Sequence, residues 1–223
     1  MLLRTPASKS EAARTLAGLA VAALCAGPSL AGRPLAVDDA NVNAVGAAHV
    51  EVWYERLADN THVGTVAPAL GVAEGVEISA AFARDAGNDV STTLLQAKFR
   101  WTPSLDTGCN IGSSIGASQT HNSSAHTVFV NGLLTCNADF GSLHLNLGST
   151  RAPEGPALGT WGVALEHGFG AWTAHVETFG QEQTSPTVQL GLRTDIAKNL
   201  QWDATVGRVN NETVLSLGMK FQF

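Results

Sequence analysis

From residue 49 onward, hydrophobic and polar residues alternate along the chain with a period of two. The stretch 143–148 shows the pattern clearly, reading Leu-His-Leu-Asn-Leu-Gly. In a β-strand such alternation places the apolar side chains on one face and the polar side chains on the other. No long helical periodicity competes with this pattern. The sequence therefore predicts an all-β protein in which one face of every strand meets an apolar environment.

Twelve segments show this alternation, and turns rich in Gly, Asn, Asp, Ser and Pro separate them. A strand that crosses a membrane needs about 9–11 residues, which these segments supply. We expect a closed antiparallel transmembrane β-barrel over residues 49–223 with short turns and about twelve strands, ten being the alternative count. The segments are 50–55, 61–70, 75–84, 96–101, 109–119, 126–136, 143–148, 157–167, 172–177, 188–193, 200–206 and 212–223.

The polar faces indicate which side of the sheet meets water. They are rich in Gly, Ala, Ser and Thr, and charged residues make up only 14% of the chain, whereas the solvated face of a soluble sheet carries many Lys and Glu. Small polar side chains suit the crowded interior of a closed barrel, with the apolar faces turned outward to lipid. Trp53 and Phe129 are exceptions because they fall on the polar face. Pro68 lacks an N–H donor, so we expect its strand to bulge or to start late there.

Aromatic residues cluster toward the ends of the apolar faces. Rings of this kind sit at the level of lipid headgroups in membrane barrels. The expected aromatic girdle consists of Tyr54, Trp101, Trp161, Trp172, Trp202, Phe221 and Phe223.

The first 31 residues have the features of a secretory signal peptide. Residues 1–14 carry three cations, 15–27 is an apolar run, and small residues precede the expected cleavage site after Ala31. The apolar run is too short to span a bilayer, and a retained N-terminal anchor is the alternative. Residues 32–48 show no strand pattern. We expect this segment either to fold inward as a plug or to remain in the periplasm.

Export places Cys109 and Cys136 where a disulfide can persist. The two residues flank a predicted hairpin centred near residues 122 and 123, so an antiparallel register sets them opposite each other. Directly opposed residues come close enough to bridge. We therefore expect a Cys109–Cys136 disulfide, two free buried thiols being the alternative.

The net charge and the distribution of basic residues argue against one class of partner, nucleic acid. The formal net charge is −6, and there is no run of Lys or Arg with which to bind a phosphate backbone. Nucleic acid is therefore not an expected partner.

The C-terminal strand carries the most specific resemblance. Residues 215–223 alternate Leu, Leu, Met, Phe and Phe with small or polar residues, Gly218 lies five residues before the end, and the chain stops on Phe223. This arrangement resembles the assembly signal of bacterial outer-membrane β-barrels. The resemblance implies a Gram-negative outer-membrane location, contact with outer-membrane lipid, and recognition of this strand by the barrel assembly machinery.

A second resemblance lies just after the expected cleavage site. Residues 33–40 read Arg-Pro-Leu-Ala-Val-Asp-Asp-Ala and precede Gly46 and the first strand, which contains Glu51. This is similar to the start of outer-membrane transporter families, one of them connected by name to a meta-cleavage pathway of phenol degradation. It implies a barrel and the passage of small molecules.

Charged residues of both signs fall on the faces assigned to the interior. Such charges must be paired or hydrated, so they form either a salt-bridged plug or the wall of a narrow aqueous path. The candidate residues lining the lumen are Glu51, Lys98, Arg100, Glu177, Arg193 and Asp203.

The sequence offers little catalytic chemistry. Ser142 and His144 share one polar face and His175 and Glu177 share another, but nothing in the sequence brings a serine beside His175. His121 and His126 flank a turn and are expected to be solvated rather than to bind a metal. We therefore expect no enzyme activity, no metal and no cofactor.

The sequence thus favours passive or weakly selective passage of small solutes. A non-conducting structural or adhesion barrel and a soluble periplasmic β-barrel that binds an apolar ligand are the alternatives.

Overall fold

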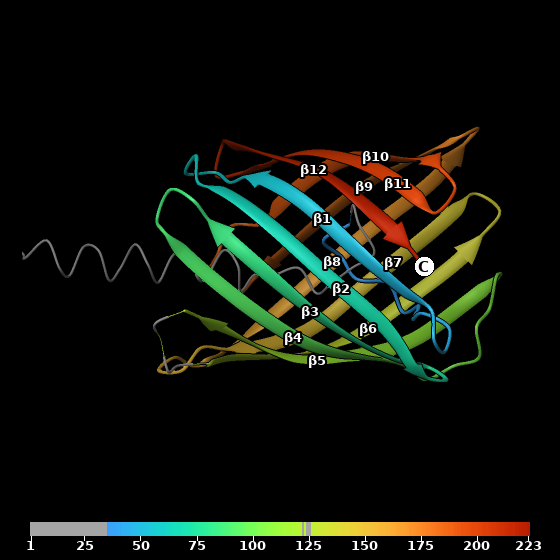
Figure 1. The fold of residues 1–223 in the computed structure, drawn as a ribbon, viewed down its shortest axis with the longest axis horizontal. Coiled ribbons are helices and arrows are strands. Elements are labelled where there is room, and N and C mark those ends of the chain that lie inside the picture. The colour runs from blue at the N-terminus through green and yellow to red at the C-terminus, as the bar shows by residue number, and fades with distance from the viewer. Residues whose placement is uncertain (1–34, 122, 124–125) are drawn as a thin grey trace, which may run out of the picture.

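Twelve antiparallel strands form one closed barrel (Figure 1). The computed structural model describes residues 35–121, 123 and 126–223. Each strand pairs with its neighbours in the sequence, and the first strand closes the barrel by pairing with the last. The strands are β1 (Ala48–Arg56), β2 (His62–Ala73), β3 (Val76–Asp85), β4 (Val90–Arg100), β5 (Gly108–Thr120), β6 (His126–Ala138), β7 (Gly141–Arg151), β8 (Ala157–Phe169), β9 (Trp172–Gln181), β10 (Thr187–Ala197), β11 (Leu200–Val209) and β12 (Glu212–Gln222).

The expected all-β closed antiparallel barrel is therefore confirmed, with the higher of the two strand counts. The predicted signal peptide, residues 1–31, lies outside the described residues. The described part of the chain contains no helix that is long and apolar enough to cross a membrane.

Several strands are joined by tight two-residue turns, and residues in some of these turns adopt a left-handed backbone. Asn210 and Asn211, which join β11 to β12, have φ angles of 49° and 66°. Two successive positive φ angles define the hairpin turn whose twist matches that of the flanking strands, and Asn tolerates this conformation. The turn that joins β10 to β11 also contains an asparagine in this conformation, Asn199, with a φ angle of 64°.

The two faces of the barrel wall differ in the way the alternation predicts. Along β7, Leu147 is 73% exposed on the outside, whereas His144 is 3% exposed on the inside. Two of the largest fully buried side chains are Glu51 and Glu177. The barrel is thus apolar outside and polar inside, the reverse of a soluble sandwich.

Pro68 is accommodated differently from the sequence expectation, which was wrong. Pro68 lies within β2 and pairs with Val50 of β1. The pairs between β2 and β3 stop after Val66 and resume at Ala69 in an unchanged register. The missing N–H therefore interrupts one ladder locally without inserting a residue. The register shift in β2 lies further on, between Gly71 and Ala73.

Small residues make room for the two aromatic side chains on the inner face. Trp53 packs with Ala67 and Ala81, and Leu94 lies against them. The Phe129 ring covers Gly116, where an added Cβ would lie 2.4 Å from the Cζ atom of the ring. Both exceptions to the alternation therefore fill the barrel interior.

The two ends of the barrel are named here by the chain termini. At the termini end, the Phe223 N–H donates to the carbonyl oxygen of Ala48 at 2.9 Å. The opposite end, which holds the 210–211 turn, is called the far end. Aromatic side chains lie on the outer face toward both ends. Trp101, Trp172, Trp202, Phe221 and Phe223 lie toward the termini end, and Tyr54 and Trp161 lie toward the far end.

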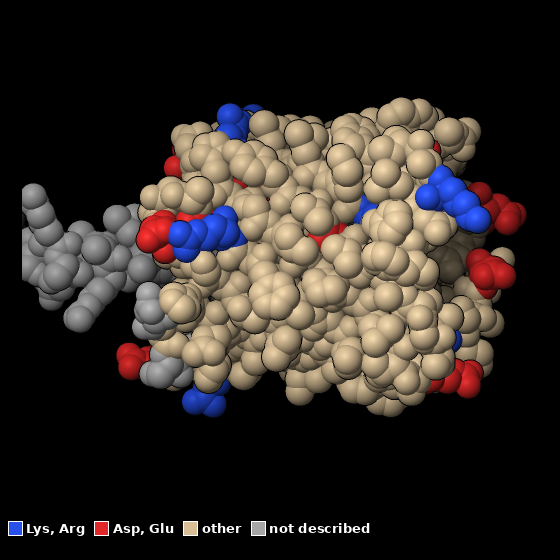
Figure 2. All heavy atoms as spheres, viewed as in Figure 1, with Lys and Arg blue, Asp and Glu red and all other residues tan. Residues whose placement is uncertain are grey.

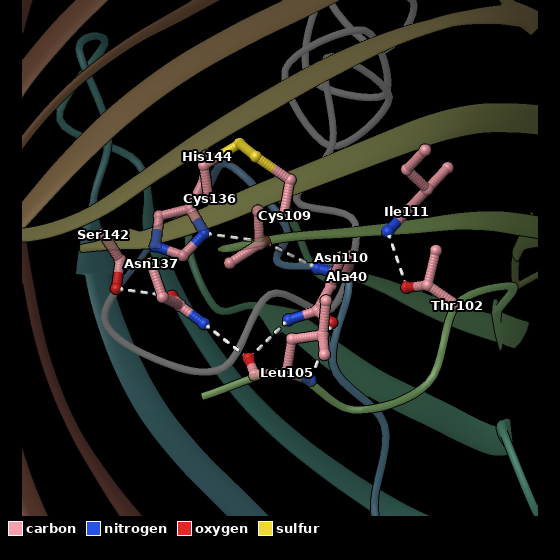
Figure 3. The surroundings of a disulfide bond; sticks show 11 residues. Ala40, Thr102, Leu105, Cys109, Asn110, Ile111, Cys136, Asn137, Ser142 and His144 are labelled. Carbon is pink, nitrogen blue, oxygen red and sulfur yellow. Dashed lines mark hydrogen bonds between the residues drawn. A yellow bond between two sulfur atoms is a disulfide. The ribbon is translucent and has the colours of Figure 1, made fainter. Parts of the chain in front are cut away.

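The expected disulfide joins β5 to β6 near the termini end (Figure 3). Cys109 and Cys136 are direct register partners. Next to them, the Nδ2 atom of Asn110 donates to the carbonyl oxygen of Leu105 at 3.0 Å, and Nδ2 of Asn137 donates to the same oxygen at 3.1 Å. These bonds fix the loop between β4 and β5 against the disulfide-linked strands.

Candidate functional site

Residues 35–47, called the inner segment below, lie inside the ring of strands (Figure 1). Leu35 and Val37 pack against Ala164 of β8, with Phe179 of β9 beside them. The wall is shaped for this contact, since a Cβ added at Gly162 would lie 2.8 Å from Cγ2 of Val37. The start of the inner segment is therefore seated on the β8–β9 side of the interior.

Glu177 of β9 holds the backbone at the start of the inner segment. Its Oε2 atom accepts hydrogen bonds from the N–H groups of Ala36 and Val37 at 2.9 and 2.8 Å. Its Oε1 atom accepts one from Nε2 of Gln189 at 2.6 Å. A carboxylate that receives several N–H donors is well compensated for its burial.

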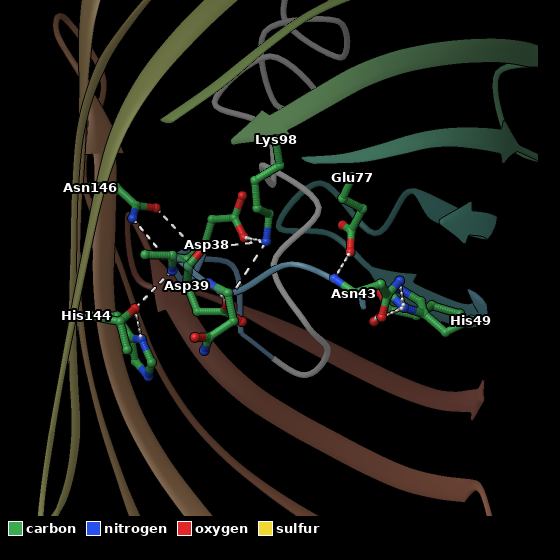
Figure 4. Close-up of polar contacts among 12 residues, drawn as sticks. Asp38, Asp39, Asn43, His49, Glu77, Lys98, His144 and Asn146 are labelled. Carbon is green, nitrogen blue, oxygen red and sulfur yellow. Dashed lines mark hydrogen bonds and ion pairs between the residues drawn. The ribbon is translucent and has the colours of Figure 1, made fainter. Parts of the chain in front are cut away.

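Asp38 is held from two sides of the barrel (Figure 4). On β7, Oδ1 of Asn146 accepts from the N–H of Asp38 and Nδ2 of Asn146 donates to its carbonyl oxygen, both at 2.7 Å. From β4, Nζ of Lys98 lies 2.6 Å from Oδ1 of Asp38. The two side chains are 4% and 0% exposed. This is a buried ion pair between the wall and the inner segment.

The charge of Lys98 also acts on the neighbouring residue Asp39. Nζ of Lys98 donates to the carbonyl oxygen of Asp39 at 3.3 Å and lies 3.9 Å from its Oδ1. Burial by itself raises the pKa of Asp39, but the attraction of Lys98, together with the smaller effects of neighbouring groups such as the Asn41 N–H, outweighs burial, so the pKa of this carboxyl lies below its ordinary value. Asp39 is therefore ionised at neutral pH.

A row of polar contacts joins the middle of the inner segment to β6, β7, β8 and β10. The N–H of Ala40 donates to Oγ1 of Thr135 at 2.9 Å, and this oxygen lies 2.9 Å from Nδ1 of His144. Nε2 of His144 lies 3.3 Å from Oε2 of Glu166. The other carboxylate oxygen of Glu166, Oε1, forms an ion pair with Nη1 of Arg193 at 2.6 Å.

This Thr-His-Glu row has the composition of a nucleophilic triad. However, Thr135 is fully buried and its hydroxyl oxygen already receives the Ala40 N–H. The row therefore positions the inner segment. Ser142, the other candidate nucleophile, donates to Oδ1 of Asn137 at 2.8 Å. Among the described residues, no group of three His, Cys, Asp or Glu side chains is arranged to hold a metal ion.

The inner segment ends on the β3 side of the interior. The N–H of Asn43 donates to Oε2 of Glu77 at 2.9 Å, and the Asn43 amide bonds to Nδ1 of His49 (Figure 4). Gly71 of β2 allows the backbone to pass, since an added Cβ would lie 2.2 Å from the carbonyl oxygen of Ala44. From β9 to β3, the inner segment thus crosses the lumen before β1 begins.

The six candidate lumen residues all project from the inner face. Glu51, Lys98, Glu177 and Asp203 are buried, and Arg100 and Arg193 are partly exposed. The structure brings them into different local groups. Lys98 and Glu177 hold the inner segment, whereas Glu51 lies 3.4 Å from Nζ of Lys220. Arg100 donates from Nε to the carbonyl oxygen of Thr102 near the termini end.

Sequence reasoning missed the residues that seat the inner segment from the wall. His144 was noted only as a residue of a polar face, and Glu77, Thr135 and Asn146 were not singled out as binding groups. The acidic pair Asp38-Asp39 in a segment without strand pattern is the one signal that points to a cation inside the barrel.

A substitution that removes both acceptor oxygens tests whether Glu177 seats the inner segment. In Glu177→Leu, the hydrogen bonds from the N–H groups of Ala36 and Val37 are lost. Loss of a hydrogen bond to a charged group costs about 1.5–3 kcal/mol. We expect amide hydrogen exchange at residues 36–37 to become roughly 10- to 100-fold faster, while the strands keep their protection. Unchanged exchange at these two amides would contradict the assignment.

The fold is that of bacterial outer-membrane porins. A KdgM porin in complex with disordered oligogalacturonate superimposes with a TM-score of 0.69 at 16% sequence identity, covering 78% of this chain and 99% of that chain. NanC porin gives a TM-score of 0.61 at 8% identity, covering 79% and 100%. The COG4313 outer membrane channel from Pseudomonas putida F1 gives 0.61 at 9% identity, covering 83% and 98%.

No curated protein matches the sequence. The resemblance to the meta-pathway phenol-degradation family is not confirmed by these comparisons. One family model, described as "Uncharacterised conserved protein UCP029691", matches residues 19–223. Because this match covers nearly the whole chain, the chain belongs to the UCP029691 family.

Proposed function

We propose that this chain is an outer-membrane channel for the passive passage of small polar solutes, narrowed by its own inner segment. The observation that supports this most strongly is the inverted wall, with an apolar outside and buried charges inside. In a bilayer only helices and closed barrels satisfy every backbone polar group, and a barrel with this polarity suits lipid outside and water inside. The similar fold of porins and of an outer membrane channel supports the same function.

The inner segment limits the size of the solute. A barrel of about twelve strands lies between eight-stranded barrels filled by side chains and open sixteen-stranded porins. The inner segment crosses this lumen from Glu177 on β9 to Glu77 on β3. We infer that solutes pass beside it, or pass when it is displaced.

The charge of the interior favours cations over anions. Within the strands, the inner faces carry nine acidic and four basic side chains, and Asp38 and Asp39 raise the acidic count to eleven. Acidic groups in a low-dielectric passage concentrate cations and repel anions. The acidic residues on the strands are Glu51, Glu55, Glu77, Asp85, Glu166, Glu177, Asp195, Asp203 and Glu212, and the basic residues are Lys98, Arg100, Arg193 and Lys220.

Planar-bilayer recording of the purified chain tests this function. We expect discrete current steps and, under a KCl gradient, a reversal potential of the sign that indicates preference for K⁺ over Cl⁻. An anion-preferring reversal potential would contradict the charge argument alone. Protein that migrates as a heat-modifiable barrel and inserts without any current would show a non-conducting structural barrel instead. Recovery in the soluble periplasmic fraction would contradict the membrane placement.

A further inference from the structure

The cations of the described residues fall into three separate places. Four of them, Lys98, Arg100, Arg193 and Lys220, point into the barrel. One, Lys198, lies in a turn at the termini end. The other four point outward at the far end, and they are Arg56, Arg84, Arg151 and Arg208. Every outward-facing cation of the described residues is therefore an arginine at the far end. In Figure 2, most of the visible Lys and Arg lie at the ends of the barrel, and the broad band between them is largely uncharged on this face.

Three of these arginines follow directly after the outer apolar stripe of their strands. Arg84 comes two residues after Phe82, and Arg208 comes two residues after Val206, and both of these apolar side chains are about half exposed. Arg56 likewise comes two residues after Tyr54. On the outer face, each arginine is the first charge beyond the apolar band. This is the level at which lipid headgroups meet a membrane barrel.

Arg208, Arg56 and Arg84 form a continuous arc over β11, β12, β1, β2 and β3. On β12, Arg208 pairs with Thr213 and Arg56 pairs with Leu215. On β2, Arg56 pairs with His62 and Arg84 pairs with Gly64. Successive arginines are thus two strands apart, or about 10 Å across the sheet. On the strand between them, their register partners lie two residues apart in both cases. We call these three residues the arginine arc.

The outer face at the termini end has a different chemistry. Trp101, Trp172, Trp202 and Phe221 lie there, and no Lys or Arg points outward at that end among residues 35–121, 123 and 126–223. Aromatic rings suit any headgroup region. Guanidinium groups bind phosphate through paired N–H donors. The two ends therefore suit leaflets of different composition.

The local partners of the arc leave it able to bind an external anion. Arg84 forms an ion pair with Asp89, whose side chain is 86% exposed. Exposed pairs of this kind contribute little and are readily exchanged. Nη2 of Arg208 donates to the carbonyl oxygen of Asn211, which is neutral. His62 lies between Arg56 and Arg84 in the register and bonds to the Tyr54 hydroxyl.

We propose that the arginine arc binds the phosphate groups of anionic lipid in the leaflet at the far end. The proposal rests on the membrane placement proposed above. It also assigns the far end to the leaflet that is richer in phosphate.

The test uses the folded, purified chain in a zwitterionic detergent, titrated with lipid A that carries two phosphates. Binding is followed by the rise in thermal unfolding temperature. Each arginine near an anionic surface contributes about a fivefold gain in affinity, so Arg56→Gln, Arg84→Gln and Arg208→Gln together should weaken binding on the order of 100-fold. Lys198→Gln, at the termini end, is the control that should leave binding unchanged, and Arg151→Gln, on the same end but outside the arc, should weaken binding by no more than about fivefold.

Each outcome decides the proposal. Loss of binding in the triple variant, with Lys198→Gln unchanged and Arg151→Gln weakened no more than about fivefold, supports it. Equal binding by the triple variant and the wild type overturns it. An equal rise in unfolding temperature with dephosphorylated lipid A, or with inorganic phosphate alone at the same concentration, also overturns it, because the arc would then not recognise lipid phosphate. Failure of the wild type to insert into bilayers would instead contradict the membrane placement.

Discussion

Replacing Lys98 with methionine is expected to release the inner segment and raise the conductance. The substitution removes the ammonium group that lies 2.6 Å from Oδ1 of Asp38, while that carboxylate stays on a side chain that is fully buried in the wild type. Removing one partner of a buried ion pair costs about 3–5 kcal/mol. This cost falls on the docking of the inner segment rather than on the strand ladders, so the barrel should remain folded with a wider lumen.

The reciprocal and double variants separate this effect from a general loosening. Asp38→Asn removes the charge from the inner segment, and the Lys98→Met/Asp38→Asn double variant should cost much less than the sum of the two single changes, because it leaves neither charge isolated. Lys198→Met, in a turn at the termini end, is the control. The measurements are single-channel conductance and amide exchange over residues 36–43. A Lys98→Met barrel with wild-type conductance and wild-type exchange would show that the ion pair does not hold the inner segment.

Placing charges on the outer face of β7 is expected to have the largest effect on stability. Leu145 and Leu147 lie near the middle of the strand on the outside, and Leu147 is the most exposed large hydrophobic residue in the described part of the chain. An arginine at the bilayer midplane costs about 2–4 kcal/mol. Leu145→Arg/Leu147→Arg should therefore lower the free energy of unfolding by roughly 4–8 kcal/mol, measured by denaturant unfolding from lipid vesicles.

An alanine pair at the same positions is the matched control. Leu145→Ala/Leu147→Ala removes apolar volume but adds no charge, and lipid tails can fill the space, so a much smaller loss is expected. If the arginine pair proved no less stable than the alanine pair, the outer face of β7 would not be in contact with lipid.

The strands were predictable because the alternation is a local property of the sequence. The same period assigned the inner and outer faces, and the centre of the predicted hairpin set Cys109 opposite Cys136. The aromatic residues near the two ends also followed from counting along strands. These features depend on neighbouring residues and on hairpin register, both of which a sequence carries directly.

The path of the inner segment was not predictable in the same way. Val37 meets Glu177 across 140 residues of chain, and Asp38 meets Asn146 across 108. Such contacts depend on which side chains the closed barrel sets around one cavity, and no local pattern records this. The prediction that β2 bulges or starts late at Pro68 was wrong for a related reason. The sequence showed that an N–H was missing, but it did not show that only the ladder toward β3 would be interrupted.

The most direct test of the central claim is a scan of solvent accessibility along β7. Nitroxide labels are placed one at a time at positions 143–148 in a background whose native cysteines are serine, and the protein is reconstituted in vesicles. Collision rates are then measured with oxygen, which concentrates in lipid, and with a water-soluble nickel chelate. The account predicts high oxygen collision rates at 143, 145 and 147 and low rates at 144, 146 and 148. High oxygen collision rates at 144, 146 and 148, or no alternation, would contradict it.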